Sequence, residues 1–142
     1  MIDVMAESDL SGVARLAVQL GYPNSPNELK DRFSELNKLP NCGLFVARTE
    51  KGEITGWVQI SAEPTSLLTD SRAIITAMVV DENYRGKGIG KALLEHAEAW
   101  TRAKGFPAIR VRSKSTRSDA HRFYLREGYA ASKISHVFEK KI

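Results

Sequence analysis

The sequence predicts an α/β (α+β) fold in which a mixed central β-sheet of six to seven strands is flanked by about four helices, within one domain covering residues 1–142. Three observations carry this prediction. Residues 74–80 form an almost continuous apolar run rich in β-branched side chains, which is typical of a strand buried on both faces. A glycine-rich turn follows at 86–90, and a helical pattern begins directly after it. The neighbouring segments extend this to the order β-α-α-β-β-β-α-β-α-β-β.

Apolar spacing and turn residues place each element. Apolar residues recur at helical intervals between positions 10 and 20, so we expect a helix there with Ser8 or Asp9 as its cap. Ser25 and Pro26 favour the start of a second helix, which a Pro-Asn pair at 40–41 ends. Gly56 indicates a bulge in a hairpin strand. The expected strands are 2–5, 43–48, 54–62, 74–80 and 108–112, with one or two more in 129–142, and the later helices cover about 89–103 and 120–127.

Composition excludes several classes of protein. The chain has one cysteine, Cys42, so it can form no internal disulfide, and a reducing cytoplasmic location is expected. We interpret Cys42 as a small half-buried residue rather than a nucleophile. No apolar window of about twenty residues predicts a membrane span, and the N-terminus lacks a signal-peptide pattern. The net charge is +4. The cations gather largely at 85–91 and 104–126, which a polyanionic small ligand explains as well as nucleic acid does.

The glycine-rich turn has the features of an anion site. Glycines at 86, 88 and 90 permit positive φ and let an anion approach the backbone without meeting a Cβ. The helix that follows begins with unpaired amide N–H groups and the positive end of its dipole. Such a loop is suited to a diphosphate. The cations that flank it are Arg85, Lys87 and Lys91.

Two common phosphate loops do not fit this turn. A Walker A loop needs Ser or Thr after a Gly-Lys pair, and the dinucleotide fingerprint needs a glycine where Leu93 stands. The hexapeptide Arg-Gly-Lys-Gly-Ile-Gly at 85–90 instead resembles the Arg/Gln-x-x-Gly-x-Gly/Ala signature of the GNAT superfamily of N-acetyltransferases. The order of elements also resembles the complete GNAT topology, so the resemblance implies a GNAT-like sheet and acetyl-CoA as acetyl donor. The residues implied in cofactor binding are Met78, Val79, Val80, Arg85, Gly86, Lys87, Gly88, Ile89, Gly90, Lys91 and Arg117.

A second motif supports the resemblance. Residues 120–129 resemble the Ala-x-x-x-Tyr-x-x-x-Gly-Phe/Tyr marker of the same family, in which the tyrosine hydroxyl points at the cofactor sulfur. By this resemblance Tyr124 is the catalytic acid that protonates the departing thiolate. A phenol has a pKa near 10 and is therefore protonated at pH 7. The alternative is that Tyr124 packs its ring and exposes its oxygen to water.

The sequence departs from the family at two points. Many members carry Asn seven residues before the tyrosine, where this chain has Arg117, which can reach a phosphate or face solvent. Many also carry a glutamate as general base on the central strand or on the strand after the long helix, and none stands on either strand here. Deprotonation then runs through water or through a residue elsewhere. The candidates are Glu63, Asp70, Asp119, His121 and His136.

These observations predict an acetyl-CoA-dependent N-acetyltransferase that moves the acetyl group to a primary amine by direct attack in a ternary complex. By resemblance, residues 20–33 and 132–137 wall the acceptor groove, and either a small molecule or a peptide fits them. We expect no metal, nucleic-acid or membrane partner, and a monomer or homodimer. The alternatives are a non-catalytic CoA-binding sensor module and a basic nucleic-acid-binding domain; the latter lacks an aromatic stacking platform.

Overall fold

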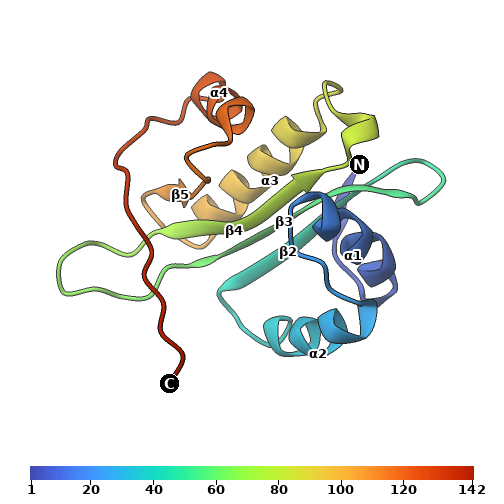
Figure 1. Cartoon of the computed structure of the whole chain (residues 1–142), viewed down its shortest axis with the longest axis horizontal. Helices are drawn as coiled ribbons and strands as arrows, with labels where there is room; N and C mark the ends of the chain where they lie inside the picture. The colour runs from blue at the N-terminus through green and yellow to red at the C-terminus, as the bar shows by residue number, and fades with distance from the viewer. The chain divides into compact units, whose positions relative to one another are not determined.

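The structure is a computed structural model that describes residues 1–142 and divides into two compact units, Met1–Val111 and Arg112–Ile142. That the chain forms one domain stays a prediction. None of the helices is long and apolar enough to cross a lipid bilayer. The first unit contains β1 (Ile2–Val4), the 3-10 turn η1 (Glu7–Asp9), α1 (Leu10–Gln19), α2 (Pro26–Leu36), β2 (Cys42–Arg48), β3 (Ile54–Ala62), β4 (Ala73–Val80), the 3-10 turn η2 (Glu82–Tyr84), α3 (Ile89–Ala103) and β5 (Ile109–Val111), and the second contains α4 (Ser118–Arg126) (Figure 1).

Five strands form one mixed sheet in the order β1-β2-β3-β4-β5. Neighbouring strands are antiparallel from β1 to β4, and β5 runs parallel to β4. The pairing of β4 with β5 is short, because it begins with Ala73 beside Ile109 and ends with Ile75 beside Val111. Beyond Ile75, β4 therefore has β3 on one side and no strand on the other. The chain passes from this unpaired end of β4 through Asp81 into η2.

Helices cover both faces of the sheet (Figure 1). On the α3 face, a Cβ placed on Gly56 would lie 3.0 Å from the Leu93 Cδ1 atom of α3 and 3.0 Å from the Val79 carbonyl oxygen. A glycine is needed there because α3 and β4 approach β3 too closely for a side chain. The opposite face packs against α1 and α2. Its core contains Val46, Trp57 and Val79 from the sheet, Leu10, Val13 and Leu16 from α1, and Phe33 from α2.

Several local predictions are confirmed. Ser25 caps α2, since its Oγ accepts a hydrogen bond from the Glu28 amide at 3.2 Å, and Pro26 occupies the first turn. The β2–β3 pairing shifts register beside Ala47, which lies opposite Gly56, so the expected bulge is present.

Asp9 occupies the N-cap position of α1, but its side chain makes no capping hydrogen bond to that helix. Its carboxylate instead accepts hydrogen bonds from the Ala6 amide, at 2.8 Å, and from Arg48.

The prediction of six to seven strands is corrected to five, because residues 129–142 form no strand. Every residue from 130 to 142 is exposed, including Ile134, Val137 and Phe138. Strand formation depends on side chains packing against cross-strand neighbours. The sequence predicts one or two strands in this segment, but no cross-strand partner is present to stabilise one.

Candidate active site

The glycine-rich loop joins η2 to α3 in a conformation that only glycine adopts readily. Gly86 and Gly88 have φ of 77° and 83°, in the left-handed region. Gly90, the third glycine, lies inside the first turn of α3 and has no positive φ, so the three glycines are not equivalent. No side chain caps α3, and its first amide bonded to a helical carbonyl is that of Ala92, 3.0 Å from the Gly88 oxygen. The preceding amides are therefore available to an anion.

The three predicted cations lie at different points of this loop. The Arg85 side chain turns back and donates from Nε to the Val80 carbonyl oxygen at 3.2 Å. The Lys87 ammonium lies 5.1 Å from the centre of the Tyr84 ring, a cation–π contact. Lys91 is exposed in the first turn of α3. Arg85 thus connects the loop to β4 through a hydrogen bond. Both lysines lie at the surface, where they are accessible to a phosphate.

The open edge of β4 presents two backbone amides. The Asp81 N–H donates to the Thr55 carbonyl of β3 at 2.8 Å, so Asp81 faces β3. Backbone groups alternate in direction along a strand, and those of Val79 therefore face β3 as well. The amides of Met78 and Val80 point to the other edge, where no strand lies. Of the three strand residues predicted to bind the cofactor, Met78 and Val80 have free backbone donors, while Val79 has a buried side chain.

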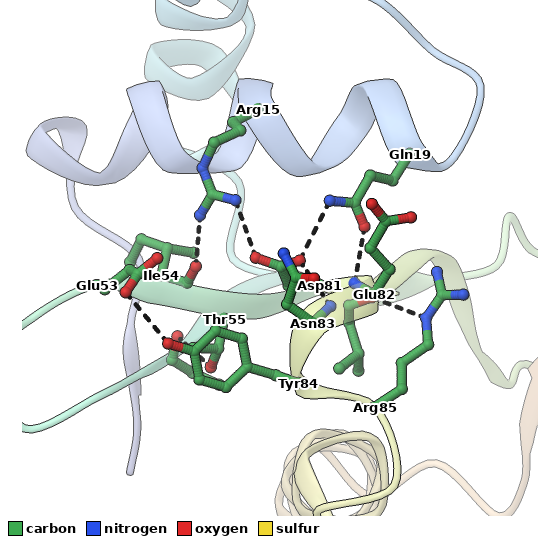
Figure 2. Close-up of polar contacts among 12 residues, drawn as sticks. Arg15, Gln19, Glu53, Ile54, Thr55, Asp81, Glu82, Asn83, Tyr84 and Arg85 are labelled. Carbon is green, nitrogen blue, oxygen red and sulfur yellow. Dashed lines mark hydrogen bonds and ion pairs between the residues drawn. The ribbon is translucent and has the colours of Figure 1, made fainter.

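A buried carboxylate holds the start of the loop, and the sequence did not single it out (Figure 2). Asp81 is 2% exposed. Its Oδ1 accepts from the Asn83 amide at 3.1 Å and from Gln19 Nε2 at 3.3 Å, and its Oδ2 accepts from Arg15 Nη1 at 2.9 Å. The Asn83 amide is the main cause of a lowered pKa, and Arg15 and Gln19 add to it against the opposing effect of burial. The only signal in the sequence was the spacing of Arg15 and Gln19, four residues apart on one face of α1.

The second unit contains the predicted catalytic tyrosine. Tyr124 lies on α4, and its ring packs against those of Phe123 and Tyr129, with centroids 5.2 and 5.9 Å away. Burial raises the pKa of Tyr124, and the positive charge of Arg117 only partly opposes this. The phenol is thus protonated at neutral pH, as an acid must be. Arg117 itself is exposed at the N-cap position of α4, and its carbonyl accepts from the His121 amide at 3.1 Å.

The five candidate bases differ in whether another group already contacts the atom that would accept the proton. The Glu63 carboxylate lies 3.1 Å from Arg110 Nη1 and 3.4 Å from Arg72 Nε, so it is already engaged by two guanidinium groups. His121 Nε2 lies 2.8 Å from the Lys114 carbonyl, which can only accept; this nitrogen therefore carries the proton. The remaining three candidates are exposed, and they are Asp70, Asp119 and His136.

Cys42 lies half-buried at the start of β2. Burial raises the pKa of its thiol. A raised pKa lowers the fraction of thiolate at neutral pH, and the thiolate is the nucleophilic form. The interpretation of Cys42 as a non-nucleophilic residue therefore agrees with its surroundings.

Comparisons with known proteins identify the family and the fold. The model of the acetyltransferase (GNAT) family matches residues 11–129. An aminoalkylphosphonate N-acetyltransferase of Salmonella typhimurium is 36% identical over 103 residues, which are 72% of this chain and 66% of that protein. The aminoglycoside 6'-N-acetyltransferase AAC(6')-Ih from Acinetobacter baumannii superposes with a TM-score of 0.87 at 19% identity, over 100% of this chain and 98% of the other. AAC(6')-Iy, solved with a bisubstrate analogue of CoA and acetylneamine, gives 0.85 at 18% identity over 100% and 98%.

The chain belongs to the acetyltransferase (GNAT) family, because the family model covers most of its length. The members of this family are acetyltransferases, one of the classes of acyltransferase, and they use acetyl-CoA as the acetyl donor. The match spans slightly less than two thirds of the Salmonella relative's own length. The two structural neighbours are under 25% identical and support the fold alone.

Proposed function

We propose that this protein transfers the acetyl group of acetyl-CoA to a primary amine by direct attack in a ternary complex, with the loop at 85–91 holding the diphosphate. The observation that carries the proposal is the combination of an open β4 edge with the unpaired amides of Gly86, Gly88 and the first turn of α3. A diphosphate needs several converging N–H donors. Lys87 and Lys91 add positive charge beside them.

The backbone of β4 is proposed to act on the acyl group. When an amine attacks a thioester carbonyl, negative charge develops on the carbonyl oxygen, and an N–H donor that is already oriented stabilises it. The Met78 and Val80 amides fit this need, because they are on the open edge and have no strand partner. Val80 is also next to Asp81, whose fixed position limits how far this end of the strand can move.

Tyr124 is proposed to protonate the departing thiolate, on the basis of its motif. The raised pKa supports this role, because the hydroxyl holds its proton throughout the physiological range. Arg117 is proposed to contact a cofactor phosphate in place of the family's Asn, and its exposure leaves the guanidinium available. Neither β4 nor β5 carries a carboxylate that could act as a base, so we propose that the attacking amine loses its proton through water.

The acceptor is proposed to be either a small molecule or a peptide amine. The aminoalkylphosphonate N-acetyltransferase relative makes small anionic amines the first class to test. A non-catalytic CoA-binding sensor is the second candidate function, and the absence of a carboxylate base on β4 or β5 is the observation that favours it.

An amine panel with detection of released CoA thiol tests both functions. The panel contains aminomethylphosphonate, an aminoglycoside and a lysine-containing peptide, each with acetyl-CoA. Amine-dependent thiol release, with the acetylated amine identified by mass spectrometry, is the expected result. Binding of CoA in calorimetry without thiol release from any amine would favour the sensor. The absence of CoA binding would reject both functions.

A further inference from the structure

Asp81 joins three segments of the first unit at the point where the loop begins (Figure 2). It is the residue between the end of β4 and η2. Its backbone is bonded to Thr55 of β3 and to the Tyr84 amide, both at 2.8 Å. Its carboxylate accepts from η2 and from α1. Strand, turn and helix are therefore connected through one residue.

The two α1 residues also make contacts beyond the carboxylate. Arg15 Nη2 donates to the Ile54 carbonyl at 2.8 Å, so the guanidinium bridges Asp81 to the start of β3. The Gln19 side-chain oxygen accepts from the Glu82 amide at 2.9 Å, while its nitrogen donates to Asp81. The backbone amides of Glu82 and Asn83, two consecutive residues of η2, thus both donate hydrogen bonds to this network. The direction in which the chain leaves β4 is therefore fixed by these side chains in addition to the backbone bond to β3.

This fixed departure matters for the loop that follows. An anion site made of backbone N–H groups is effective only if those groups already point at one place, because ordering them on binding costs affinity. The loop begins at Arg85, directly after η2, and the glycines at 86 and 88 provide little rigidity of their own. A buried anchor immediately before flexible glycines is suited to holding the amides in place. Asp81 is too buried to touch the ligand itself.

We propose that Asp81, held by Arg15 and Gln19, is a positioning residue that pre-organises the diphosphate-binding loop. The inference rests on the proposed function of that loop. It assigns to α1 a part in cofactor affinity, although no α1 residue was among the expected cofactor contacts. Loss of the network should weaken ligands that carry the diphosphate and leave ligands without it nearly unaffected.

A second buried carboxylate provides a matched control. Asp9 is 5% exposed and pairs with Arg48, which also bonds Asp3 at 3.0 Å. Like Asp81 it accepts from a backbone amide, that of Ala6. It lies at the start of α1, whereas Arg15 and Gln19 lie in the later part of the same helix. Asp9→Asn therefore removes a comparable buried ion pair without touching η2 or the loop.

The test is calorimetric titration of Asp81→Asn and Asp9→Asn with CoA, 3'-dephospho-CoA and pantetheine. CoA and dephospho-CoA share the diphosphate, and pantetheine lacks it. In Asp81→Asn we expect the Kd of both diphosphate ligands to rise about tenfold, with pantetheine changed less than about twofold. In Asp9→Asn the ratio of the CoA and pantetheine constants should stay at the wild-type value, although the Tm falls. Gln19→Met keeps the side-chain length and serves if Asp81→Asn does not fold.

Two results would contradict the proposals, and they distinguish an error in the proposed function from an error in the role of Asp81. If wild-type protein binds pantetheine as tightly as CoA, the diphosphate loop itself is misassigned and the proposed function fails. If wild-type protein prefers CoA but Asp81→Asn and Gln19→Met lose no more of that preference than Asp9→Asn does, Asp81 is a structural residue only and the inference is overturned.

Discussion

At the scale of the residue, the hydroxyl of Tyr124 is the feature with the largest expected effect on rate. Tyr124→Phe removes one oxygen and keeps the ring that packs on Phe123 and Tyr129. A bond to the departing sulfur strengthens as charge develops, so it lowers the transition state more than the ground state. We expect kcat to fall by about tenfold or more, within or just below the usual range for general acids. Steady-state kinetics on the best amine of the panel measures this.

The Michaelis constant for acetyl-CoA should change much less in the same variant, because the hydroxyl is not part of the diphosphate loop. Phe123→Leu serves as the packing control, since it alters the same aromatic cluster and leaves the hydroxyl. A Tyr124→Phe enzyme as fast as wild type would reduce Tyr124 to a packing residue.

Substitutions at Gly88 and Gly52 distinguish the loss of the anion site from the effect of backbone strain. A Cβ at Gly88 or at Gly52 would meet no atom within 4 Å, and their φ angles are 83° and 86°. Valine at either position is therefore strained to a similar degree, by about 1–3 kcal/mol. We expect Gly88→Val to weaken CoA binding strongly and Gly52→Val, in the β2–β3 hairpin, to leave it unchanged. Calorimetry on both variants, with Tm as the measure of strain, decides the point. Unchanged affinity in folded Gly88→Val would remove the loop from the site.

At the scale of the element, α3 and β4 both approach β3 closely at Gly56. A Cβ at Gly56 would lie 3.0 Å from the Val79 carbonyl, a backbone atom that cannot rotate away. At Gly43 it would lie 2.9 Å from side-chain atoms of the Phe45 and Trp100 rings, and no backbone atom is among its nearest contacts. We expect Gly56→Ala to cost about 1–3 kcal/mol of the free energy of unfolding, and Gly43→Ala less. Urea unfolding of the two variants tests this, and a smaller loss at Gly56 would contradict it.

Elements with a local signal were predictable from the sequence. The apolar run of β4, the glycines after it and the helical spacing of α3 are contained within short windows, and the structure confirms them. The Asp81 network was not predictable, because Asp81 and Arg15 are 66 residues apart and no pattern within either segment links them. The strands expected in 129–142 are absent for a related reason: strand formation depends on a neighbouring strand, and the sequence of the segment itself does not supply one.

At the scale of the whole molecule, two buried aspartates contribute to how stability responds to acid. Burial opposes ionisation of Asp9, but hydrogen bonds from Arg48 and the Ala6 amide outweigh it and lower its pKa. The Asn83 amide is the largest cause of the lowered pKa of Asp81. Each carboxylate therefore binds protons less readily in the folded chain than in the unfolded chain, where the pKa of Asp is about 3.9. Their contribution to stability is present in full above that value.

We expect the free energy of unfolding to decrease as the pH falls from about 4 through the lowered pKa values of the folded state, because the unfolded chain takes up protons first. Urea unfolding at pH 7, 5, 4 and 3 measures the decrease. Asp9→Asn and Asp81→Asn each remove one of the two groups, so each variant should be less stable than wild type at pH 7 and show a shallower decrease in acid. The double variant should show the shallowest. An acid decrease as steep in the double variant as in wild type would assign it to other carboxylates and contradict the lowered pKa values of Asp9 and Asp81.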